Sequence, residues 1–269
     1  MAPLYGVLGY PVKHSLSPAM FGAAFYAYDM DASYEHFEVH PDDIRMFLKE
    51  AREKPIMGFS VTIPHKESIM PFLDGLDKHA RAIGAVNTVA NVNGKLKGYN
   101  TDWIGAQKAL EDVTELEGKR VVILGAGGSA RAITYACAQA GAEVTVLNRT
   151  LKKAEELAAD FNVNAGALSE IFNFRPHILI HTTSVGMTPN IKESLVPADF
   201  FIRGMVVLDI VYNPLETKLV KDAKRAECRI VPGYKMLLYQ GEKQFEIWFD
   251  KKPRTDKMEE ALLERFKEL

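Results

Sequence analysis

Apolar residues in the N-terminal part of the chain recur with two different periods. Short apolar runs rich in β-branched and aromatic residues predict strands, and apolar positions repeated every three to four residues predict helices. In chain order we predict a strand at residues 4–9, a helix at 17–28, a strand at 34–39, a helix at 41–54 and a strand at 58–62. This alternation predicts an α/β domain with a mostly parallel sheet.

A hairpin and a second α/β series follow this region. Asn93-Gly94 lies between the segments 86–92 and 95–100, and this dipeptide tolerates the positive φ angles of a tight hairpin turn. Asp102 precedes a helix predicted at 103–113 and can cap it. The later elements alternate in the same way, with strands at 121–124, 143–147, 178–182 and 206–210, helices at 130–140 and 151–161, and C-terminal helices at 236–249 and 256–266.

The two series predict two α/β domains that meet near the helix after Asp102. We place the first domain at residues 1–102 and the second at residues 103–235. Residues 236–269 are too few to bury a core of their own, so their helices are expected to pack back on the first domain. The chain shows no internal repeat and no low-complexity segment.

The charge balance gives no reason to expect nucleic acid or a membrane as partner. Lys and Arg number 33 and Asp and Glu 35 in 269 residues, so a small molecule is the expected partner. Cys137 and Cys228 are too few for a disulfide framework and lack metal-ligand spacing, which predicts buried thiols, a reducing compartment and no metal. No apolar run reaches the ~18 residues of a membrane span and no signal-peptide pattern is present, so a cytoplasmic location is expected.

A glycine-rich turn follows the predicted strand at 121–124 and opens a helix. Its residues are Gly125, Ala126, Gly127, Gly128, Ser129 and Ala130. In a Rossmann fingerprint the first glycine permits the tight turn, the second lets the backbone approach a pyrophosphate, and the small sixth residue allows close helix–strand packing. The helix N-terminus offers unpaired N–H groups to the phosphates. The turn therefore predicts a dinucleotide site.

The next strand ends in Asn148-Arg149-Thr150, about 20 residues after the glycines, where an NAD enzyme would carry a carboxylate for the ribose. Arg149 can instead bind a 2′-phosphate with two parallel hydrogen bonds, and Thr150 and Lys153 add a hydroxyl and a second cation. These cations could simply be solvated charges, yet cations are unfavourable at a helix N-terminus unless an anion binds there. The pattern predicts NADP.

Hydroxyls and a lysine in the first domain are candidates for a substrate site. Ser15 and Ser17 precede a helix, where Ser17 alone would be explained as an N-cap residue. Thr62 ends the strand at 58–62 and Lys66 follows it, at the sheet edge where open α/β sheets collect ligands. By position alone Lys66 is better explained as an ordinary surface lysine, and Asp102 could be only a helix cap.

Nine motifs taken together resemble the shikimate dehydrogenase family, in the family's order and over nearly the whole chain. They are residues 9–18, Val61-Thr62-Ile63-Pro64-His65-Lys66, Gly84-Ala85-Val86-Asn87-Thr88, Gly98-Tyr99-Asn100-Thr101-Asp102, residues 125–130, Asn148-Arg149-Thr150, Thr183-Ser184-Val185-Gly186-Met187, residues 209–214 and residues 233–240. The resemblance implies an NADPH-dependent, reversible reduction of 3-dehydroshikimate to shikimate, in the pathway to chorismate and the aromatic amino acids, by a monomer or homodimer. It also implies that the first domain binds substrate and the second, of Rossmann type, binds NADP, around a cleft between them.

The resemblance assigns a role to each candidate residue. Lys66 and Asp102 are the expected catalytic pair, although the sequence leaves open which of them is the formal acid-base. The substrate carboxylate would be held by Ser15, Ser17 and Tyr212, and the ring hydroxyls by Thr62, Asn87, Asp102 and Gln240. Besides the glycine turn, Asn148, Arg149, Thr150 and Lys153, the cofactor contacts would be Thr183, Ser184, Val211, Gly233 and Met236.

Three of the motifs or their flanking residues depart from the family pattern. Phe21-Gly22 stands where His-Asn is frequent, and Ser60 and His181 each stand where Asn is frequent. None of these changes removes a catalytic group, but Ser60 reaches less far than Asn and weakens the expected ring-hydroxyl contacts.

Three alternatives remain. A shikimate/quinate dehydrogenase would use the same pair but tolerate quinate or NAD. A non-catalytic sensor on this fold would lack Lys66 or Asp102, and a folate-linked dehydrogenase would not need Ser15, Ser17 and Tyr212.

Overall fold

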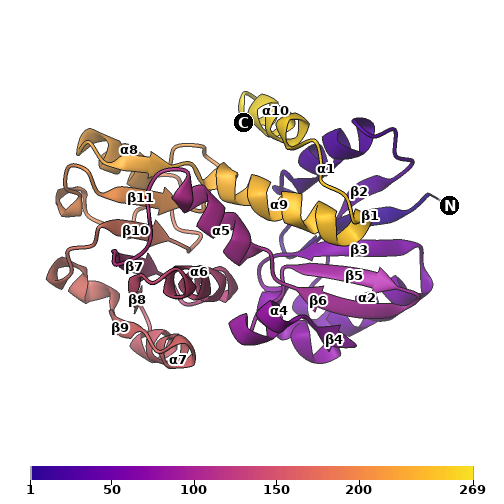
Figure 1. The fold of residues 1–269 in the computed structure, drawn as a ribbon, viewed down its shortest axis with the longest axis horizontal. Helices are drawn as coiled ribbons and strands as arrows, with labels where there is room; N and C mark the ends of the chain where they lie inside the picture. Colours follow the sequence, from indigo (N-terminus) through magenta and orange to yellow (C-terminus); the bar gives the residue numbers. More distant parts are fainter. Residues whose placement is uncertain (1, 269) are drawn as a thin grey trace. The chain divides into compact units, whose positions relative to one another are not determined.

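The computed structural model describes residues 2–268. The chain forms two compact α/β units: unit 1 comprises the residues up to Thr101 together with Gln240–Glu268, and unit 2 comprises Asp102–Tyr239. Each unit is built on a six-stranded sheet (Figure 1). The predicted α/β class is confirmed.

Unit 1 holds one sheet with the strand order β2-β1-β3-β5-β6-β4. The pairs β1·β2, β1·β3 and β4·β6 are parallel, whereas β5 is antiparallel to β3 and β6. The elements are β1 (Leu4–Gly9), α1 (Ser17–Tyr26), β2 (Ser33–Glu38), a 3₁₀ turn (Pro41–Asp43), α2 (Ile44–Glu53), β3 (Ile56–Val61), α3 (His65–Ser68), a 3₁₀ turn (Met70–Phe72), β4 (Gly75–Leu76), α4 (Lys78–Ile83), β5 (Thr88–Val92), β6 (Lys95–Tyr99) and α10 (Thr255–Phe266), together with α9 (Gly233–Phe249) from Gln240 onward.

The predicted hairpin is confirmed between β5 and β6. Asn93 and Gly94 both have positive φ, 52° and 79°, which is the backbone that a two-residue turn of this twist requires. The helix predicted at 41–54 begins instead as a 3₁₀ turn and becomes α-helical only at Ile44.

Apolar side chains alternate between the two faces of the unit 1 sheet. Leu8 and Phe59 lie on the face covered by α2, where they pack against Ile44 and Leu48. The opposite face is aromatic. It gathers rings from β1, β2, α1 and α9, namely Tyr5, Tyr34, Phe21, Phe25, Phe245, Trp248 and Phe249.

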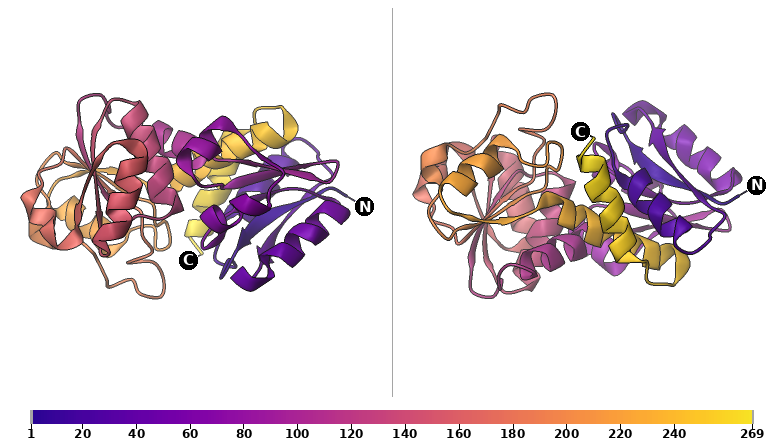
Figure 2. Two further views of the ribbon diagram at one scale, coloured as in Figure 1. Left: turned by 90° about the horizontal axis from the view of Figure 1, so that it is seen from below. Right: turned by 90° about the horizontal axis from the view of Figure 1, so that it is seen from above.

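The C-terminal helices complete this aromatic face. The second half of α9 supplies Phe245 and Trp248, and α10 packs along α1, as Figure 1 and the right-hand view in Figure 2 show. The expectation that the C-terminal helices pack on the first domain is therefore confirmed.

Unit 2 holds a fully parallel sheet with the order β12-β11-β10-β7-β8-β9. Numbered from the first strand of this unit, the order is that of a Rossmann sheet, with the direction of winding reversing between β7 and β10. The elements are α5 (Asp102–Glu111), β7 (Arg120–Leu124), α6 (Gly128–Gln139), β8 (Glu143–Asn148), α7 (Leu151–Phe161), β9 (Asn164–Ala167), a 3₁₀ helix (Leu168–Asn173), β10 (Ile178–His181), a 3₁₀ turn (Ala198–Phe200), β11 (Val206–Asp209), α8 (Lys218–Arg225), β12 (Arg229–Val231) and the first half of α9.

Both faces of the unit 2 sheet are covered, which explains the continuous apolar runs of its central strands. Val121, Ile123 and their neighbours pack beneath α5, α6 and α7, and Val122 and Leu124 face the 3₁₀ segments and α8. Cys137 lies in this core, and burial raises the pKa of its thiol to about 12. Within residues 2–268, no helix is long and apolar enough to cross a membrane.

Candidate active site

The glycine turn lies at the switch point of the unit 2 sheet, between β7 and β10. Gly125 has a φ of +114°, which a residue with a side chain rarely adopts. A Cβ built on Gly125 would lie 2.5 Å from the Thr182 hydroxyl and 3.0 Å from Thr183 Cγ2. The Thr182 hydroxyl donates to the Leu124 carbonyl at 2.7 Å, so the loop after β10 packs directly on the turn. In open α/β sheets this crevice binds the ligand.

The residues after Gly125 fit a dinucleotide. A Cβ built on Gly127 would meet no atom within 4 Å, so packing within the protein does not require glycine there, and the open space suits a pyrophosphate. Gly128 and Ser129 begin α6, whose first turn holds no acidic residue. Ala126 is half-buried, and Ala130 is buried in the core against the sheet, as the fingerprint requires.

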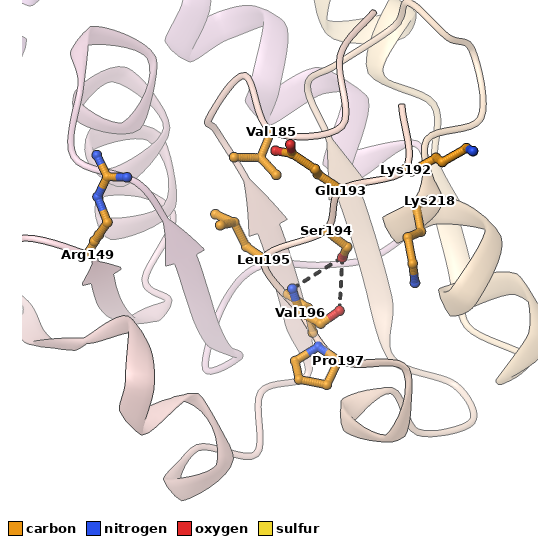
Figure 3. Close-up of a pocket in the computed structure, with 9 residues that line it drawn as sticks. All are labelled: Arg149, Val185, Lys192, Glu193, Ser194, Leu195, Val196, Pro197 and Lys218. Carbon is orange, nitrogen blue, oxygen red and sulfur yellow. Dashed lines mark hydrogen bonds between the residues drawn. The ribbon is translucent and has the colours of Figure 1, made fainter. Parts of the chain in front are cut away.

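Arg149 lies at the end of β8 beside a pocket of about 580 Å³ (Figure 3). Val185, Lys192 and Lys218 also line the pocket, with Glu193 as its one carboxylate. Among the described residues, the Arg149 side chain makes no ion pair or hydrogen bond with the protein. An exposed, uncommitted guanidinium at this strand end fits a phosphate better than a ribose hydroxyl.

The neighbours of Arg149 form the start of α7. The Asn148 amide donates to the Thr150 carbonyl at 3.0 Å, which fixes the turn between β8 and the helix. Thr150 is the N-cap residue, but its side chain makes no capping bond, and the first turn of α7 holds no acidic residue. Lys153 is exposed in that turn. The helix start therefore carries a hydroxyl and a cation that the fold does not use.

Val211, Gly233 and Met236, which were also predicted to contact the cofactor, have structural roles of their own. The Val211 amide donates to Asp209 Oδ1 at 3.0 Å, and a Cβ on Gly233 would overlap the Asp209 carbonyl. Met236 is 5% exposed and belongs to the core. Tyr212 follows Val211 and is half-buried. Val211 and Gly233 thus shape the end of β11, and Met236 fills the core, whether or not a cofactor touches them.

Ser15 and Ser17 are brought together at the start of α1. Their hydroxyls lie 3.2 Å apart, and the Ser17 amide donates to the Ser15 hydroxyl at 3.3 Å. The N-cap residue of α1 is Leu16, and no side chain caps the helix. The simple explanation of Ser17 as an N-cap is therefore wrong, because Ser17 is already the first helical residue.

Thr62 and Lys66 flank the end of β3. The Thr62 amide donates to the Leu8 carbonyl at 2.8 Å, and the Lys66 carbonyl accepts from the Val86 amide at 2.7 Å. These bonds fix the backbone before α3 and within it. His65 lies between them, fully buried, and its Nε2 donates to the Val39 carbonyl at 2.8 Å. The segment that carries Lys66 is thus anchored by a buried imidazole.

The contribution of the buried His65 can be tested through the dependence of the free energy of unfolding on pH. Burial lowers the pKa of His65, and Nδ1 has no hydrogen-bond partner among the described residues. The unfolded chain therefore takes up a proton near pH 6.5 before the folded chain does, and the free energy of unfolding falls as pH falls below that value. His65→Gln keeps a donor for Val39 without a titrating ring, so its loss of stability between pH 7 and pH 5 should be smaller.

Urea unfolding at pH 7, 6 and 5 measures this difference. Part of the fall in the free energy of unfolding with pH should remain in the variant, because burial also lowers the pKa of His14. If the free energy of unfolding of His65→Gln fell with pH as steeply as that of the unmodified protein, His65 would not be the source of the acid sensitivity.

Asn87 is the centre of a buried hydrogen-bond network in unit 1. Its Nδ2 donates to Thr101 Oγ1 at 2.9 Å and to Gln240 Oε1 at 3.1 Å, and its Oδ1 accepts from the Thr101 amide at 2.7 Å and from the Thr88 hydroxyl at 2.8 Å. Asn87 and Gln240, which lie 153 positions apart in the sequence, are therefore direct partners. Asp102 follows Thr101 and is buried at the start of α5.

The same network contains residues that the sequence did not reveal. The Gln244 amide donates to the Thr88 hydroxyl at 2.9 Å and accepts from the Ser60 hydroxyl at 2.7 Å, and Ser60 lies 2.6 Å from the Tyr34 hydroxyl. Ser60 is therefore committed to the fold rather than to a ligand. Its short side chain suits this position because Tyr34 reaches toward it from β2.

The strand order and the glycine turn give unit 2 the architecture of the Rossmann class of dinucleotide-binding folds. The family model of the shikimate dehydrogenase substrate binding domain matches residues 7–89. Those of shikimate / quinate 5-dehydrogenase and of the shikimate 5'-dehydrogenase C-terminal domain match residues 106–211 and 233–263.

Individual relatives match almost the whole chain. A shikimate dehydrogenase (NADP(+)) of Pyrococcus abyssi is 46% identical over 264 residues, covering 97% of this chain and 98% of that protein. A crystal structure of a shikimate dehydrogenase in complex with NADP+ has 40% identity and a TM-score of 0.94, over 98% of this chain and 96% of that chain. The Thermus thermophilus enzyme in complex with NADP(H) and shikimate has 37% identity and a TM-score of 0.90, over 97% and 99%. The chain belongs to the shikimate dehydrogenase family.

Proposed function

We propose that this protein catalyses the reversible, NADPH-dependent reduction of 3-dehydroshikimate to shikimate, a step toward chorismate and the aromatic amino acids. The observation that carries the proposal is the 46% identity to an NADP-dependent shikimate dehydrogenase over 97% of the chain. We further propose that unit 1 binds the substrate and unit 2 binds NADP. The family model named for substrate binding matches residues 7–89, which supports this division.

NADPH supplies the hydride for the carbonyl carbon. Gly125 to Ala130 and the N-terminus of α6 would hold the pyrophosphate, because the space at Gly127 is open and the first amides of a helix have no partner within it. Arg149, with Thr150 and Lys153, would bind the 2′-phosphate. The loop carrying Thr183 and Ser184, with Val211, Gly233 and Met236, would border the nicotinamide end. Asn148 would act by fixing the turn that presents Arg149.

Lys66 and Asp102 would manage the proton at the substrate oxygen. When a hydride reaches a carbonyl carbon, negative charge develops on the oxygen, and an ammonium positioned there can donate a proton or stabilise the alkoxide. Asp102 would orient the Lys66 ammonium and a ring hydroxyl. The bond from the Val86 amide to the Lys66 carbonyl and the anchor at His65 hold the lysine backbone in place for this task.

The polar side chains of unit 1 suit a small polyhydroxylated acid. The paired hydroxyls of Ser15 and Ser17 can donate to a carboxylate, and Thr62, Asn87 and Gln240 can bind ring hydroxyls. The Asn87 amide already uses both donors and both lone pairs. A substrate hydroxyl that binds it must therefore replace one of these bonds, and the 3.1 Å bond from Nδ2 to Gln240 is longer than the 2.9 Å bond from Nδ2 to Thr101.

The test is an assay of shikimate and of quinate, each with NADP+ and with NAD+. Shikimate with NADP+ should give the highest kcat/KM. Comparable turnover of quinate would instead favour the shikimate/quinate dehydrogenase alternative, and absence of turnover with all four pairs would favour a ligand sensor. The presence of both Lys66 and Asp102 argues against the sensor.

Tyr212 provides a separate prediction about the carboxylate. Tyr212→Phe keeps the ring and deletes one hydrogen bond to a charged group, which is worth about 1.5 to 3 kcal/mol, so kcat/KM for shikimate should fall by roughly 10- to 150-fold. Steady-state kinetics with the carboxamide analogue of shikimate is the control. The analogue should be a poor substrate for the unmodified protein and lose little more in the variant. Equal losses for acid and amide would show that Tyr212 does not bind the carboxylate.

A further inference from the structure

A buried histidine–aspartate pair connects the loops at the switch point, and the proposed reaction assigns no role to it. His181 is the last residue of β10 and Asp209 the last of β11, directly opposite in the parallel register. Each is 1% exposed, and Nδ1 of His181 lies 2.8 Å from Oδ1 of Asp209. Burying such groups is costly unless every polar atom is hydrogen-bonded. The pair therefore calls for an account of its partners.

Every polar atom of the pair has a partner, and the partners lie on three different segments. Asp209 Oδ1 also accepts from the Val211 amide at 3.0 Å, and Oδ2 accepts from the Thr217 hydroxyl at 2.7 Å. On the other side, Nε2 of His181 lies 2.6 Å from Thr183 Oγ1. The pair thus connects the loop after β10, the segment after β11 and the start of α8.

The Asp209 carboxylate sets the direction of the bond to Nδ1, and the tautomer that this selects in a neutral imidazole sets the direction of the bond to Nε2. An ionised carboxylate only accepts, so Nδ1 of His181 must donate to it. In a neutral imidazole Nε2 then carries a lone pair, and Thr183 must donate its hydroxyl proton to Nε2. The Val185 amide donates to the same Thr183 oxygen at 3.2 Å. Thr183 is left with one lone pair and no proton to offer a ligand.

The loop that this pair holds touches both parts of the proposed cofactor site. Thr183 Cγ2 would lie 3.0 Å from a Cβ on Gly125, so the threonine forms the wall of the glycine turn. Val185, whose amide is bonded to Thr183, lines the pocket beside Arg149. Figure 3 shows Val185 on the side of the pocket that faces Arg149. A shift of Thr183 would therefore move both walls at once.

We propose that His181 and Asp209 are positioning residues for the cofactor, which hold the Thr182–Met187 loop against the glycine turn and keep the Thr183 oxygen as an acceptor. This rests on the proposed NADP-dependent function. Thr183 would then bind a donor such as a ribose hydroxyl or a carboxamide N–H, and not a phosphate oxygen. Sequences with Asn at this position can do the same, because an amide donates to Asp209 through nitrogen and accepts from Thr183 through oxygen.

The test measures NADP+ binding by calorimetry in the absence of substrate, so it does not depend on shikimate turnover. His181→Phe deletes both side-chain bonds but keeps a planar aromatic ring, and should weaken NADP+ binding by about 10-fold, the scale of a lost hydrogen bond. His181→Asn should restore affinity to within about three-fold of the unmodified protein. In turnover, KM for NADP+ should rise in His181→Phe while kcat at saturating NADP+ stays unchanged.

Thr217→Val is the matched control. It removes the other side-chain bond to Asp209, at a site in the N-cap of α8, and so should lower stability without changing NADP+ affinity. Equal weakening in Thr217→Val and His181→Phe would reduce the pair to a structural element and overturn the proposal. Unchanged affinity in His181→Phe would also overturn it.

Thr183→Val keeps the proposal testable if His181→Phe does not fold. It should weaken NADP+ binding, and nitrogen NMR of the apo protein should show the His181 Nε2 resonance shifting as its donor is lost, with the Nδ1–H form retained. If the double variant His181→Phe/Thr183→Val folds, it should bind NADP+ no more weakly than the weaker-binding of the two single variants, because His181 acts on the cofactor only through Thr183. If the losses of NADP+ affinity in the two single variants multiplied in the double variant, the proposed coupling of His181 and Thr183 would be contradicted. An Nε2 resonance that does not respond to Thr183→Val would contradict the bond from Thr183 to His181.

Discussion

Lys66→Ala should lower kcat for shikimate oxidation by at least about 100-fold with the fold intact, the scale expected when positioned proton-transfer help is lost. The reason is that the hydride leaves a carbinol carbon only as its oxygen loses a proton, and no other cation is proposed at that oxygen. Steady-state kinetics at saturating shikimate and NADP+ measures the loss. Lys54→Ala, at an exposed lysine paired with Glu50, is the matched control and should retain full activity.

Asp102→Asn should lower kcat by a similar factor, because an amide cannot orient the Lys66 ammonium by charge. It keeps the size of the side chain, which matters at a residue that is 4% exposed. Thermal unfolding should separate this loss from misfolding. Near wild-type turnover in either variant would remove that residue from the catalytic pair.

Arg149→Ala should raise KM for NADPH by roughly 10- to 150-fold, as expected for a lost hydrogen bond to a charged group, and leave turnover with NADH little changed. Only the 2′-phosphate loses a partner in this variant. Lys152→Ala is the matched control, since Lys152 lies nearby in the first turn of α7 but is paired with Glu156 at 3.9 Å. Equal losses with the two cofactors would point to adenine stacking, and a preference of the unmodified protein for NADH would refute the assignment.

Elements governed by local sequence were predicted closely. The strand at 4–9 and the helix at 151–161 have the predicted bounds, and the Asn93-Gly94 turn is where its φ preferences place it. The Rossmann strand order could not be derived in this way, because it depends on which strands pair across long separations. The short strands β4, β9 and β12 were missed because two to four residues show no period.

The candidate site also contains residues that local sequence could indicate and residues that only tertiary packing brings in. Residues at strand ends, such as Thr62 and Arg149, could be proposed as site residues because parallel strands bring their carboxyl ends to one edge. Partners supplied by distant segments were not found. Gln244 and Thr101 enter the Asn87 network only through tertiary packing, and His181 appeared in the sequence as a departure from a motif rather than as the partner of Asp209.

The discontinuity of unit 1 has a consequence for synthesis on the ribosome. Residues up to Thr101 emerge first, but the segment from Gln240 that covers their aromatic face emerges only after all of unit 2. At ~5–20 residues per second this delay lasts on the order of 10 to 30 s. During that time Phe21, Phe25 and Tyr34 lack their partners Phe245 and Trp248. The nascent chain thus exposes an apolar surface that chaperones can bind. The first domain to be synthesised is therefore the last to complete its fold.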